Sequence, residues 1–428
     1  MRMPRREQIL IVGAGRAGVA AAEELRMLGF DGDLVILHDE EEAPYDRPSC
    51  AKGLLTGHSR PSDVTMPIMP GVEAHWKLGR TAVHLDADAH LVVTDTDEVF
   101  EYDGLVVASG AYPMAPPGWP IGEPGLHVLY RMADAWRLRS ELRWADSVAV
   151  VGGGLTGCEV ASAVRGMARD CYLVDSKPYP MSGPLGEHVG RLVGEEMLAD
   201  GVRLRCGRRV AGLDRARHGG WTLILDDGEA ITVDVVVAAT GERPDTRWLQ
   251  ECPDVDTTDG VLCDEALRVV GAEDVVAAGT VARWPNLQYS ATPRRVGQWI
   301  TALEHGRAAA RTLLSKGHPV EPVTHLPRFW SEQFGLRIQV CGQTPSDSQI
   351  SVTEMRPGRT DVARAGVLVG YHEDGVMIGL AAVNAPGPFT PMARAMLANA
   401  GPNVSSAPIA PAAQATADPR RRLLAAVG

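Results

Sequence analysis

Lysine is scarce in this sequence, and long apolar runs are missing from it. Only four of its 428 residues are lysines, and 54 acidic residues against 42 lysines and arginines give a net charge of −12. A chain this acidic is poorly suited to neutralising phosphates, so we expect no nucleic-acid binding. No apolar run approaches the roughly 20 residues that cross a bilayer, and no signal-peptide segment precedes the first strand-like run. We therefore expect no membrane association and a location in the cytoplasm.

Cysteine patterns that hold metals or build disulfide frameworks are absent as well. The seven cysteines are odd in number and scattered, with no Cys-x-x-Cys pair and no cluster with histidine. This pattern supports neither a zinc site nor any other metal site, and it does not support a disulfide framework. Reduced thiols in a reducing compartment fit it best.

Two segments of the chain repeat the same order of strand, glycine turn, helix and strand. Residues 8–37 open on the apolar run 9–12, and residues 147–174 open on the run 147–151. Continuous apolar runs of this length are typical of strands in a parallel sheet that is buried on both faces. We therefore predict an α/β protein with a duplicated βαβ unit. At 428 residues the chain is long enough for two or three domains.

The first strand of the first unit ends in a Gly-x-Gly-x-x-Gly turn. Gly13 permits the tight exit from the strand, Gly15 lets a pyrophosphate approach the backbone, and Gly18 lets the helix pack closely on the strand. The free N–H groups at the start of the helix then bind the phosphates. Asp39 follows about 20 residues later, where a carboxylate can accept hydrogen bonds from a ribose.

The second unit repeats this motif, with its glycines at Gly152, Gly154 and Gly157. One such motif is a weak indication, whereas two copies in the same context predict two dinucleotides in one chain, FAD and a nicotinamide nucleotide. Asp175 stands at the acidic position and favours NADH, because it would repel the extra phosphate of NADPH. Lys177, Arg208 and Arg209 are near in sequence and keep NADPH open.

Further motifs resemble those of the FAD-dependent ferredoxin reductases, a group that includes rubredoxin, putidaredoxin and dioxygenase-system reductases. Residues 44–52 (PYDRPSCAK) resemble the family segment P-Y-x-R-P-P-L-S-K, and residues 329–335 (FWSEQFG) resemble the start of its C-terminal domain. The similarity covers nearly all of residues 8–400 in order, including residues 239–244, 277–279 and 298–299.

The resemblance implies the glutathione-reductase type of fold, with two Rossmann-like three-layer dinucleotide-binding domains and a C-terminal α+β domain. The FAD-binding domain would be in two parts, 1–112 and 241–322, with a NAD-binding domain, 113–240, between them. An α+β interface domain, 323–402, and a low-complexity tail, 403–428, would follow.

The resemblance also implies a function. The chain would be a flavoprotein oxidoreductase that transfers electrons from NADH or NADPH through FAD to a ferredoxin-type iron–sulfur protein. That protein would in turn supply a cytochrome P450 or an oxygenase. Whether the enzyme is a monomer or a homodimer stays open.

Site residues follow from the same resemblance. Arg47 and Lys52 would lie at the flavin, and Glu159 would pair with Lys52 beside flavin N5. A cation there stabilises the anionic reduced flavin, and a carboxylate partner compensates for its burial. Alternatively, Lys52 and Glu159 are two unrelated surface charges.

Two tryptophans and three further positions complete the predicted set. Trp299 would flank the flavin and Trp330 the nicotinamide entry, and ordinary core packing is the alternative for each. The resemblance adds Gly279 and Thr280 to the FAD site, and Gly241 to the NAD site.

Thr280 departs from the family pattern, because the family has an aspartate there that reaches the ribityl chain of FAD. A hydroxyl keeps one hydrogen bond but loses the charge-assisted one, a deficit of roughly 1–2 kcal/mol. FAD should then still bind, although less tightly. A second interpretation is that the chain uses the flavin in another way or has lost it. A further alternative is a non-enzymatic flavoprotein scaffold.

Cys50 is the other departure, since it replaces a leucine two residues before Lys52. In related NADH peroxidases and coenzyme A disulfide reductases a single redox cysteine occupies a similar place. The alternative function is therefore reduction of a disulfide, persulfide or peroxide through a Cys50 thiolate. The simpler interpretation is a small buried cysteine that fills space in the core.

Four arginines are a candidate docking face for an acidic iron–sulfur protein near the flavin edge. They are Arg283, Arg294, Arg295 and Arg328. Solvated arginines without a partner explain the same pattern equally well.

Overall fold

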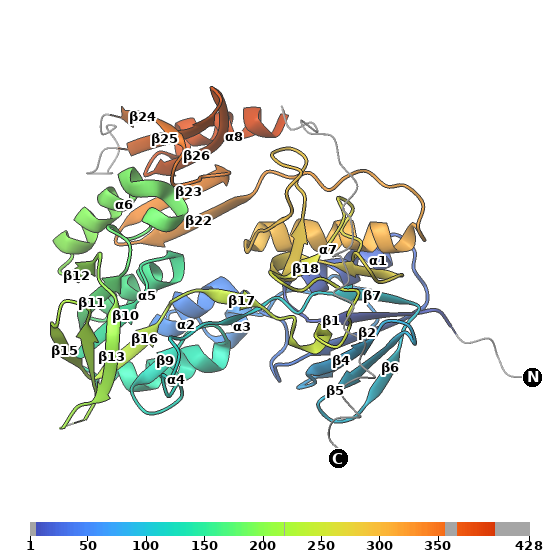
Figure 1. Ribbon diagram of the computed structural model, residues 1–428, viewed down its shortest axis with the longest axis horizontal. Helices are drawn as coiled ribbons and strands as arrows, with labels where there is room; N and C mark the ends of the chain where they lie inside the picture. Colours follow the sequence, from blue (N-terminus) through green and yellow to red (C-terminus); the bar gives the residue numbers. More distant parts are fainter. Residues whose placement is uncertain (1–5, 218, 356–365, 399–428) are drawn as a thin grey trace, which may run out of the picture.

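The computed structural model describes residues 6–217, 219–355 and 366–398. Three five-stranded sheets dominate it. In Figure 1 the first lies on the right, the second on the left and the third above the second. The predicted tail, 403–428, lies outside the described residues, and so do residues 399–402 at the end of the predicted C-terminal domain.

The first sheet is parallel and has the strand order β19-β7-β1-β2-β3. Its strands are β1 (Gln8–Val12), β2 (Asp33–His38), β3 (His75–Leu78), β7 (Gly104–Val107) and β19 (Val275–Ala277). Helices α1 (Arg16–Met27) and α7 (Trp299–Leu314) pack together on one face. On the other side lies a small antiparallel sheet of β4 (Ala82–Asp86), β5 (Leu91–Thr94) and β6 (Val99–Glu101) (Figure 1). The strands are apolar because both faces of the sheet are covered.

The second sheet is also parallel and has the order β12-β11-β10-β16-β9. Its strands are β9 (Leu126–Val128), β10 (Ser147–Val151), β11 (Asp170–Asp175), β12 (Arg203–Cys206) and β16 (Val235–Ala238). The helices of this unit are α4 (Met132–Leu142), α5 (Leu155–Gly166) and α6 (Ser182–Ala199). An antiparallel sheet is added by β13 (Val210–Arg215), β14 (Trp221–Leu225) and β15 (Ala230–Val233). The predicted duplication of a βαβ unit is thus confirmed.

The third sheet is antiparallel and is followed by a helix, as expected for a C-terminal α+β unit. Its strands are β22 (Arg328–Gln333), β23 (Leu336–Gly342), β24 (Gln349–Met355), β25 (Gly366–Glu373) and β26 (Val376–Val383), and the helix is α8 (Pro386–Ala398). Apolar side chains of β23 and β25 belong to the same core cluster as those of β10, α4 and α5. The third sheet is therefore packed firmly against the second unit.

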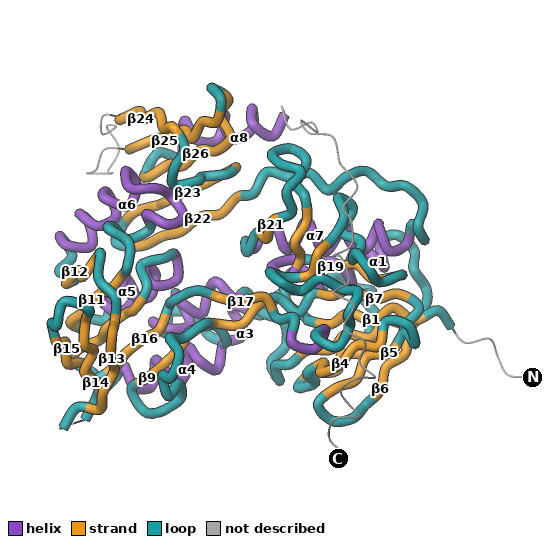
Figure 2. The backbone as a smooth tube through the Cα atoms, in the orientation of Figure 1, coloured by secondary structure: helices purple, strands orange, loops and turns teal. Residues whose placement is uncertain are grey.

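Two short strands carry the chain between the two parallel sheets. β8 (Ala111–Pro113) leaves the first unit, β17 (Glu242–Pro244) returns to it, and the two pair antiparallel (Figure 2). The predicted domain boundaries at 112/113 and 240/241 fall at these strands and stay a prediction.

Short elements complete the fold. The 3₁₀ helices are η1 (Arg47–Ala51), η2 (Arg247–Leu249) and η3 (Gly279–Val281). The short α-helices are α2 (Gly53–Thr56) and α3 (Pro61–Val64), and the short strands are β18 (Val261–Leu262), β20 (Ala282–Trp284) and β21 (Arg294–Arg295). Among all helices of the described residues, none is long and apolar enough to cross a membrane.

Candidate active site

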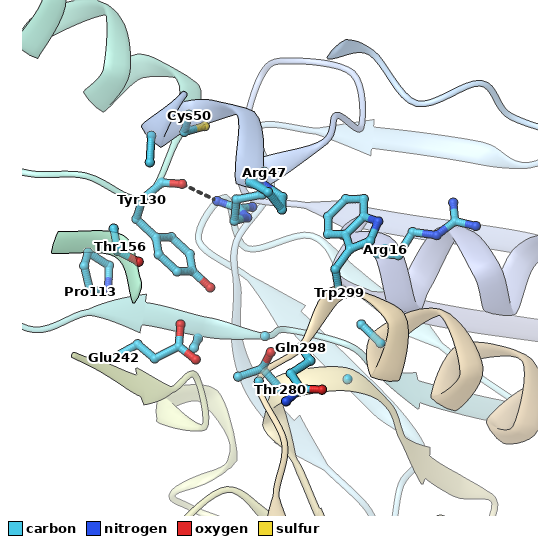
Figure 3. Close-up of a pocket in the computed structure, with 18 of the residues that line it drawn as sticks. Arg16, Arg47, Cys50, Pro113, Tyr130, Thr156, Glu242, Thr280, Gln298 and Trp299 are labelled. Carbon is cyan, nitrogen blue, oxygen red and sulfur yellow. Dashed lines mark hydrogen bonds between the residues drawn. The ribbon is translucent and has the colours of Figure 1, made fainter. Parts of the chain in front are cut away.

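A cavity of about 680 Å³ lies where the three units meet. Its lining comes from the first glycine turn, from η1, from the start of α5, from the start of α7 and from β22. Figure 3 shows Arg47, Tyr130, Thr280 and Trp299 around this space, each from a different segment of the chain. A cavity of this size accommodates a cofactor-sized molecule.

The first glycine turn forms one end of the cavity. Gly13 has φ +109° and takes the chain out of β1, and a Cβ on Gly18 would collide with the carbonyl of Gly13. Gly15 stands before the first residue of α1 with no atom within 4 Å of a Cβ position, so its backbone is open to the cavity. The free N–H groups at the start of α1 can therefore bind phosphates there.

The second turn has nearly the same backbone. Gly152 has φ +110°, a Cβ on Gly157 would collide with the carbonyl of Gly152, and Gly154 is open like Gly15. Only Gly154 of these three glycines lines the cavity. The predicted Asp175 lies outside it, at the end of β11, where its Oδ1 accepts a hydrogen bond of 3.2 Å from the N–H of Lys177. Burial raises the pKa of Asp175, although backbone N–H groups oppose the shift.

Lys52 and Glu159 form an ion pair inside the cavity. Lys52 Nζ lies 2.8 Å from Glu159 Oε1, and the hydroxyl of Ser331 donates a 2.6 Å hydrogen bond to the same oxygen. Glu159 is only 6% exposed, so these partners compensate for the burial of its carboxylate. The pair joins η1 and α2 to α5, and Ser331 ties it to β22. The two residues are thus not the unrelated surface charges of the alternative interpretation.

Arg47 lines the cavity and is held in place by the carboxylate of Glu40 and the ring of Tyr130. Its Nη2 lies 2.7 Å from Glu40 Oε1, its Nη1 donates to the carbonyl of Tyr130, and its guanidinium lies 4.6 Å from the centre of the Tyr130 ring. The hydroxyl of Tyr45 donates to Glu40 Oε2. Burial alone would raise the pKa of Glu40, but Arg47 and this hydroxyl outweigh it and lower the pKa.

Asp39 lines the cavity at the end of β2, as the motif predicts. Its carboxylate pairs with Arg131, which stands just before α4. Trp299, the first residue of α7, and Trp330 on β22 also line the cavity. Trp330 is 53% exposed, so it is not an ordinary core residue.

Cys50 also lines the cavity but is packed into the core. Its side chain is 3% exposed, and burial raises the pKa of the thiol to about 12. A thiol with this pKa is protonated at neutral pH and is a poor nucleophile. The structure therefore favours the space-filling interpretation over a redox cysteine.

Carboxylates neutralise most of the arginines of the candidate docking face. Arg283 pairs with Asp256 at 2.6 Å, Arg295 with Asp259 at 2.8 Å and Arg328 with Glu304 at 2.9 Å. Arg294 is exposed on β21. The positive charge predicted for this face is thus smaller than the sequence suggests, and the docking face stays a prediction.

Comparison with known proteins identifies the chain. A family model described as pyridine nucleotide-disulphide oxidoreductase matches residues 7–306, and one described as reductase C-terminal matches residues 328–424. The chain belongs to the pyridine nucleotide-disulphide oxidoreductase family. Members of this family are oxidoreductases that use FAD and NAD(H), so the predictions of an oxidoreductase and of these two cofactors are confirmed.

Relatives within this family are ferredoxin reductases. The ferredoxin–NAD(+) reductase component of the p-cumate 2,3-dioxygenase system of Pseudomonas putida is 30% identical over 346 residues, 80% of this chain and 83% of that protein. Terpredoxin reductase of a Pseudomonas species is 30% identical over 393 residues, 90% of this chain and 91% of that protein. The predicted resemblance to ferredoxin reductases is therefore confirmed.

The predicted fold class is confirmed by a solved structure. Putidaredoxin reductase, in its covalent complex with putidaredoxin, matches with a TM-score of 0.83 at 22% identity over 93% of this chain and 94% of that chain. This oxidoreductase thus has the glutathione-reductase type of fold.

The described residues fit FAD in this oxidoreductase. The turn at Gly13 to Gly18 leaves an open backbone at Gly15 for phosphates, and the cavity continues past Arg47 to the Lys52–Glu159 pair. No side chain blocks the first turn among the described residues that line it.

Several residues of the site were missed by sequence analysis. Glu40 and Tyr130 hold Arg47, Ser331 holds Glu159, and Glu242 projects its carboxylate into the cavity (Figure 3). Glu40 could have been found, since it directly follows Asp39 at the end of a strand. Ser331 lies within the FWSEQFG motif, but its partner is 172 positions away.

Proposed function

We propose that this protein is a ferredoxin reductase, which passes electrons from NADH through FAD to a ferredoxin-type iron–sulfur protein. One observation carries the proposal: the first glycine turn, the Lys52–Glu159 pair and Gly154 of the second turn line one cavity. Two nucleotides that begin at the two turns would therefore have their reactive rings at Lys52. Because one relative serves a dioxygenase system, we infer that the acceptor supplies an oxygenase or a cytochrome P450.

We assign the cofactor roles as follows. Gly13, Gly15 and Gly18 would hold the FAD phosphates, and Asp39 its ribose, with Arg47, Gly279, Thr280 and Trp299 along the rest of the molecule. Gly152, Gly154, Gly157, Gly241 and Trp330 would serve NADH. When bound, FAD accepts an electron pair from the nicotinamide and releases electrons singly to the iron–sulfur protein.

Lys52 is the residue that we expect to act on the reaction itself. Its ammonium carries the positive charge that favours electron density at the flavin end of the cavity. Glu159 keeps this ammonium in place, and Ser331 fixes the carboxylate oxygen that Lys52 contacts. Lys52 and Glu159 are therefore the proposed catalytic residues, with Ser331 as a positioning residue.

The nicotinamide nucleotide is proposed to be NADH. Asp175 lies at the end of β11, where its carboxylate can accept hydrogen bonds from a ribose but would repel a phosphate. Among the basic residues near Asp175, Arg208 already pairs with Asp227 at 2.6 Å, which makes it less available to such a phosphate. A cytoplasmic location is part of the proposal, since all seven cysteines are unpaired thiols.

An anaerobic titration of the purified protein with NADH tests the function. We expect NADH to bleach the flavin absorbance, and cytochrome c to be reduced only after a ferredoxin is added. A bound flavin that stays oxidised with excess NADH would overturn the proposal. Reduction of a disulfide or peroxide at a comparable rate, lost in Cys50→Ser, would instead support the single-cysteine alternative.

A further inference from the structure

Glu242 places its carboxylate in the cavity, where no group of the described residues binds it. It is the first residue of β17, pairs with Pro113 of β8 in the crossing between the units, and lines the cavity. In Figure 3 its side chain lies on the same side of the cavity as Thr280 and Gln298, below Arg47 and Tyr130. Within the described part of the chain it has neither a hydrogen bond nor an ion pair of 4 Å or less.

The surroundings of Glu242 explain why it stays unpaired. Arg47 and Arg295 attract its charge from a distance, but Arg47 is bound to Glu40 and Arg295 to Asp259. The walls of the cavity partly shield Glu242 from water and raise its pKa in spite of these two cations. The residue is nevertheless exposed to the open cavity, so a molecule that fills the cavity would bury the carboxylate and would have to supply a donor to it.

Glu242 and Thr280 approach the same point of the cavity wall. A Cβ on Gly297 would lie 2.8 Å from Glu242 Oε1 and 3.3 Å from Thr280 Cγ2. A larger residue at 297 would thus press on both side chains. Glycine leaves room for the carboxylate and the hydroxyl to line the wall together.

The neighbours of this point identify the part of the cofactor that reaches it. Gly279, just before Thr280, stands against Ala17 in the first turn of α1, where a Cβ would lie 3.0 Å from the Ala17 Cβ. This is beside the phosphate end of the cavity, whereas Lys52 and Glu159 mark the flavin end. Phosphates offer no hydrogen-bond donor at neutral pH. The ribityl chain, which joins the phosphates to the flavin, carries several hydroxyl donors.

We propose that Glu242 is a further FAD-binding residue, which accepts hydrogen bonds from the ribityl hydroxyl groups of FAD. It supplies, from β17, the carboxylate that Thr280 does not provide. The inference rests on the proposed function only in that the cavity holds FAD. It also removes the reason to expect weak FAD binding in this protein.

The dissociation constant of FAD tests this proposal. The full-length holoenzyme is diluted, and released FAD is measured by its fluorescence. We expect Glu242→Val to raise the dissociation constant about tenfold or more, because a hydrogen bond to a charged acceptor is lost. Glu242→Gln keeps one acceptor oxygen and should give a smaller rise. Glu251→Val removes an exposed carboxylate outside the cavity lining and serves as the matched control, with no change expected.

A second test moves the carboxylate from position 242 to position 280 and so does not depend on a single variant. Thr280→Asp should weaken FAD binding in the native background, where two carboxylates would lie close together. In the Glu242→Val background the same change should restore the dissociation constant to within about threefold of the native value. Equal weakening by Thr280→Asp in both backgrounds overturns the proposal, and so does a Glu242→Val variant within twofold of the native protein. If the native protein holds no FAD at all, the proposed function fails instead.

Discussion

The two glycine turns have nearly identical backbones but very different acidic partners. Gly13 and Gly152 have φ values of +109° and +110°, and both turns are followed by an open glycine before the helix. Asp39 is paired with Arg131, whereas the described residues give Asp175 no ion pair and only backbone N–H donors. The turn itself therefore cannot distinguish one nucleotide from another. The side chains at the end of the next strand carry that information.

The two turns also differ in the chain that follows them. α1 packs against α7, which comes from almost 300 positions further along, and α5 packs against β22 of the third sheet. The helix that follows the first turn is thus packed within its own unit, while the helix that follows the second turn also contacts the third sheet. This difference suits a permanently bound cofactor at the first turn and an exchanging one at the second.

The largest effect is expected from adding a methyl group to the last glycine of each turn, Gly18 or Gly157, which packs against the first glycine of the same turn. Gly18→Ala should cost about 3 kcal/mol and release FAD, because the Cβ meets the carbonyl of Gly13. Gly157→Ala, with the same clash at Gly152, should leave the protein yellow but stop its reduction by NADH. Flavin absorbance before and after NADH separates the two cases. If both variants lose FAD equally, the two turns do not serve separate nucleotides.

The Lys52–Glu159 pair, where the two units meet, should give the next largest effect. Lys52→Met should slow reduction of the flavin by NADH about a hundredfold, since it removes the cation and leaves the carboxylate with Ser331 alone. Stopped-flow absorbance under anaerobic conditions measures this rate. Lys77→Met removes a lysine that pairs with Glu98 outside the cavity lining and should leave the rate unchanged. An unchanged rate in Lys52→Met would contradict the role of the pair.

Substitutions of the two acids, Asp39 and Asp175, should have smaller effects than the changes above, and they should differ in their effect on the preference for NADH over NADPH. Asp175→Asn should raise the ratio of kcat/KM for NADPH to that for NADH by roughly tenfold, because repulsion of the extra phosphate disappears. Asp39→Asn should leave this ratio as it is, even if it weakens FAD binding. Steady-state kinetics with both nucleotides decide the point. A shift of the ratio in the Asp39 variant would mean that the two acids are assigned to the wrong nucleotides.

The smallest effect is expected at Cys50. If its thiol were reactive, it would add a second redox centre to the first unit. Since the pKa of its thiol is raised to about 12, the thiolate is scarce at neutral pH and becomes abundant only as the pH approaches that value. Cys50→Ala should therefore change ferredoxin-linked turnover less than twofold and cost about 1 kcal/mol of stability. Iodoacetamide labelling of this thiol should be slow at pH 8. Rapid labelling there would reopen the single-cysteine alternative.

The parts of the fold and site that the sequence predicts are those with local signals. In each βαβ unit the glycine turn, the acid after it and the two strands lie within about 30 residues of one another, so the local pattern reveals them. Lys52 and Glu159 were found only through motifs, because nothing local links positions 107 residues apart.

The missed residues share a physical reason. Glu242 approaches Gly297 and Thr280 only after β17 has crossed back to the first unit, and Ser331 reaches Glu159 across the interface of two units. The ion pairs that neutralise Arg283, Arg295 and Arg328 also depend on how separate loops come together. A list of charged positions cannot show which of them are already neutralised.

The split construction of the first sheet has a consequence for how the protein is made. β19 and α7 are translated after all the strands of the second sheet, which lie between residues 126 and 238. On the ribosome the middle unit can fold as soon as it emerges, while the N-terminal segment waits unfinished for its last strand and helix. Capture of the flavin is then a late event in biogenesis, and a nascent chain truncated before residue 275 should have the second glycine turn but neither the strand nor the helix that completes the flavin site.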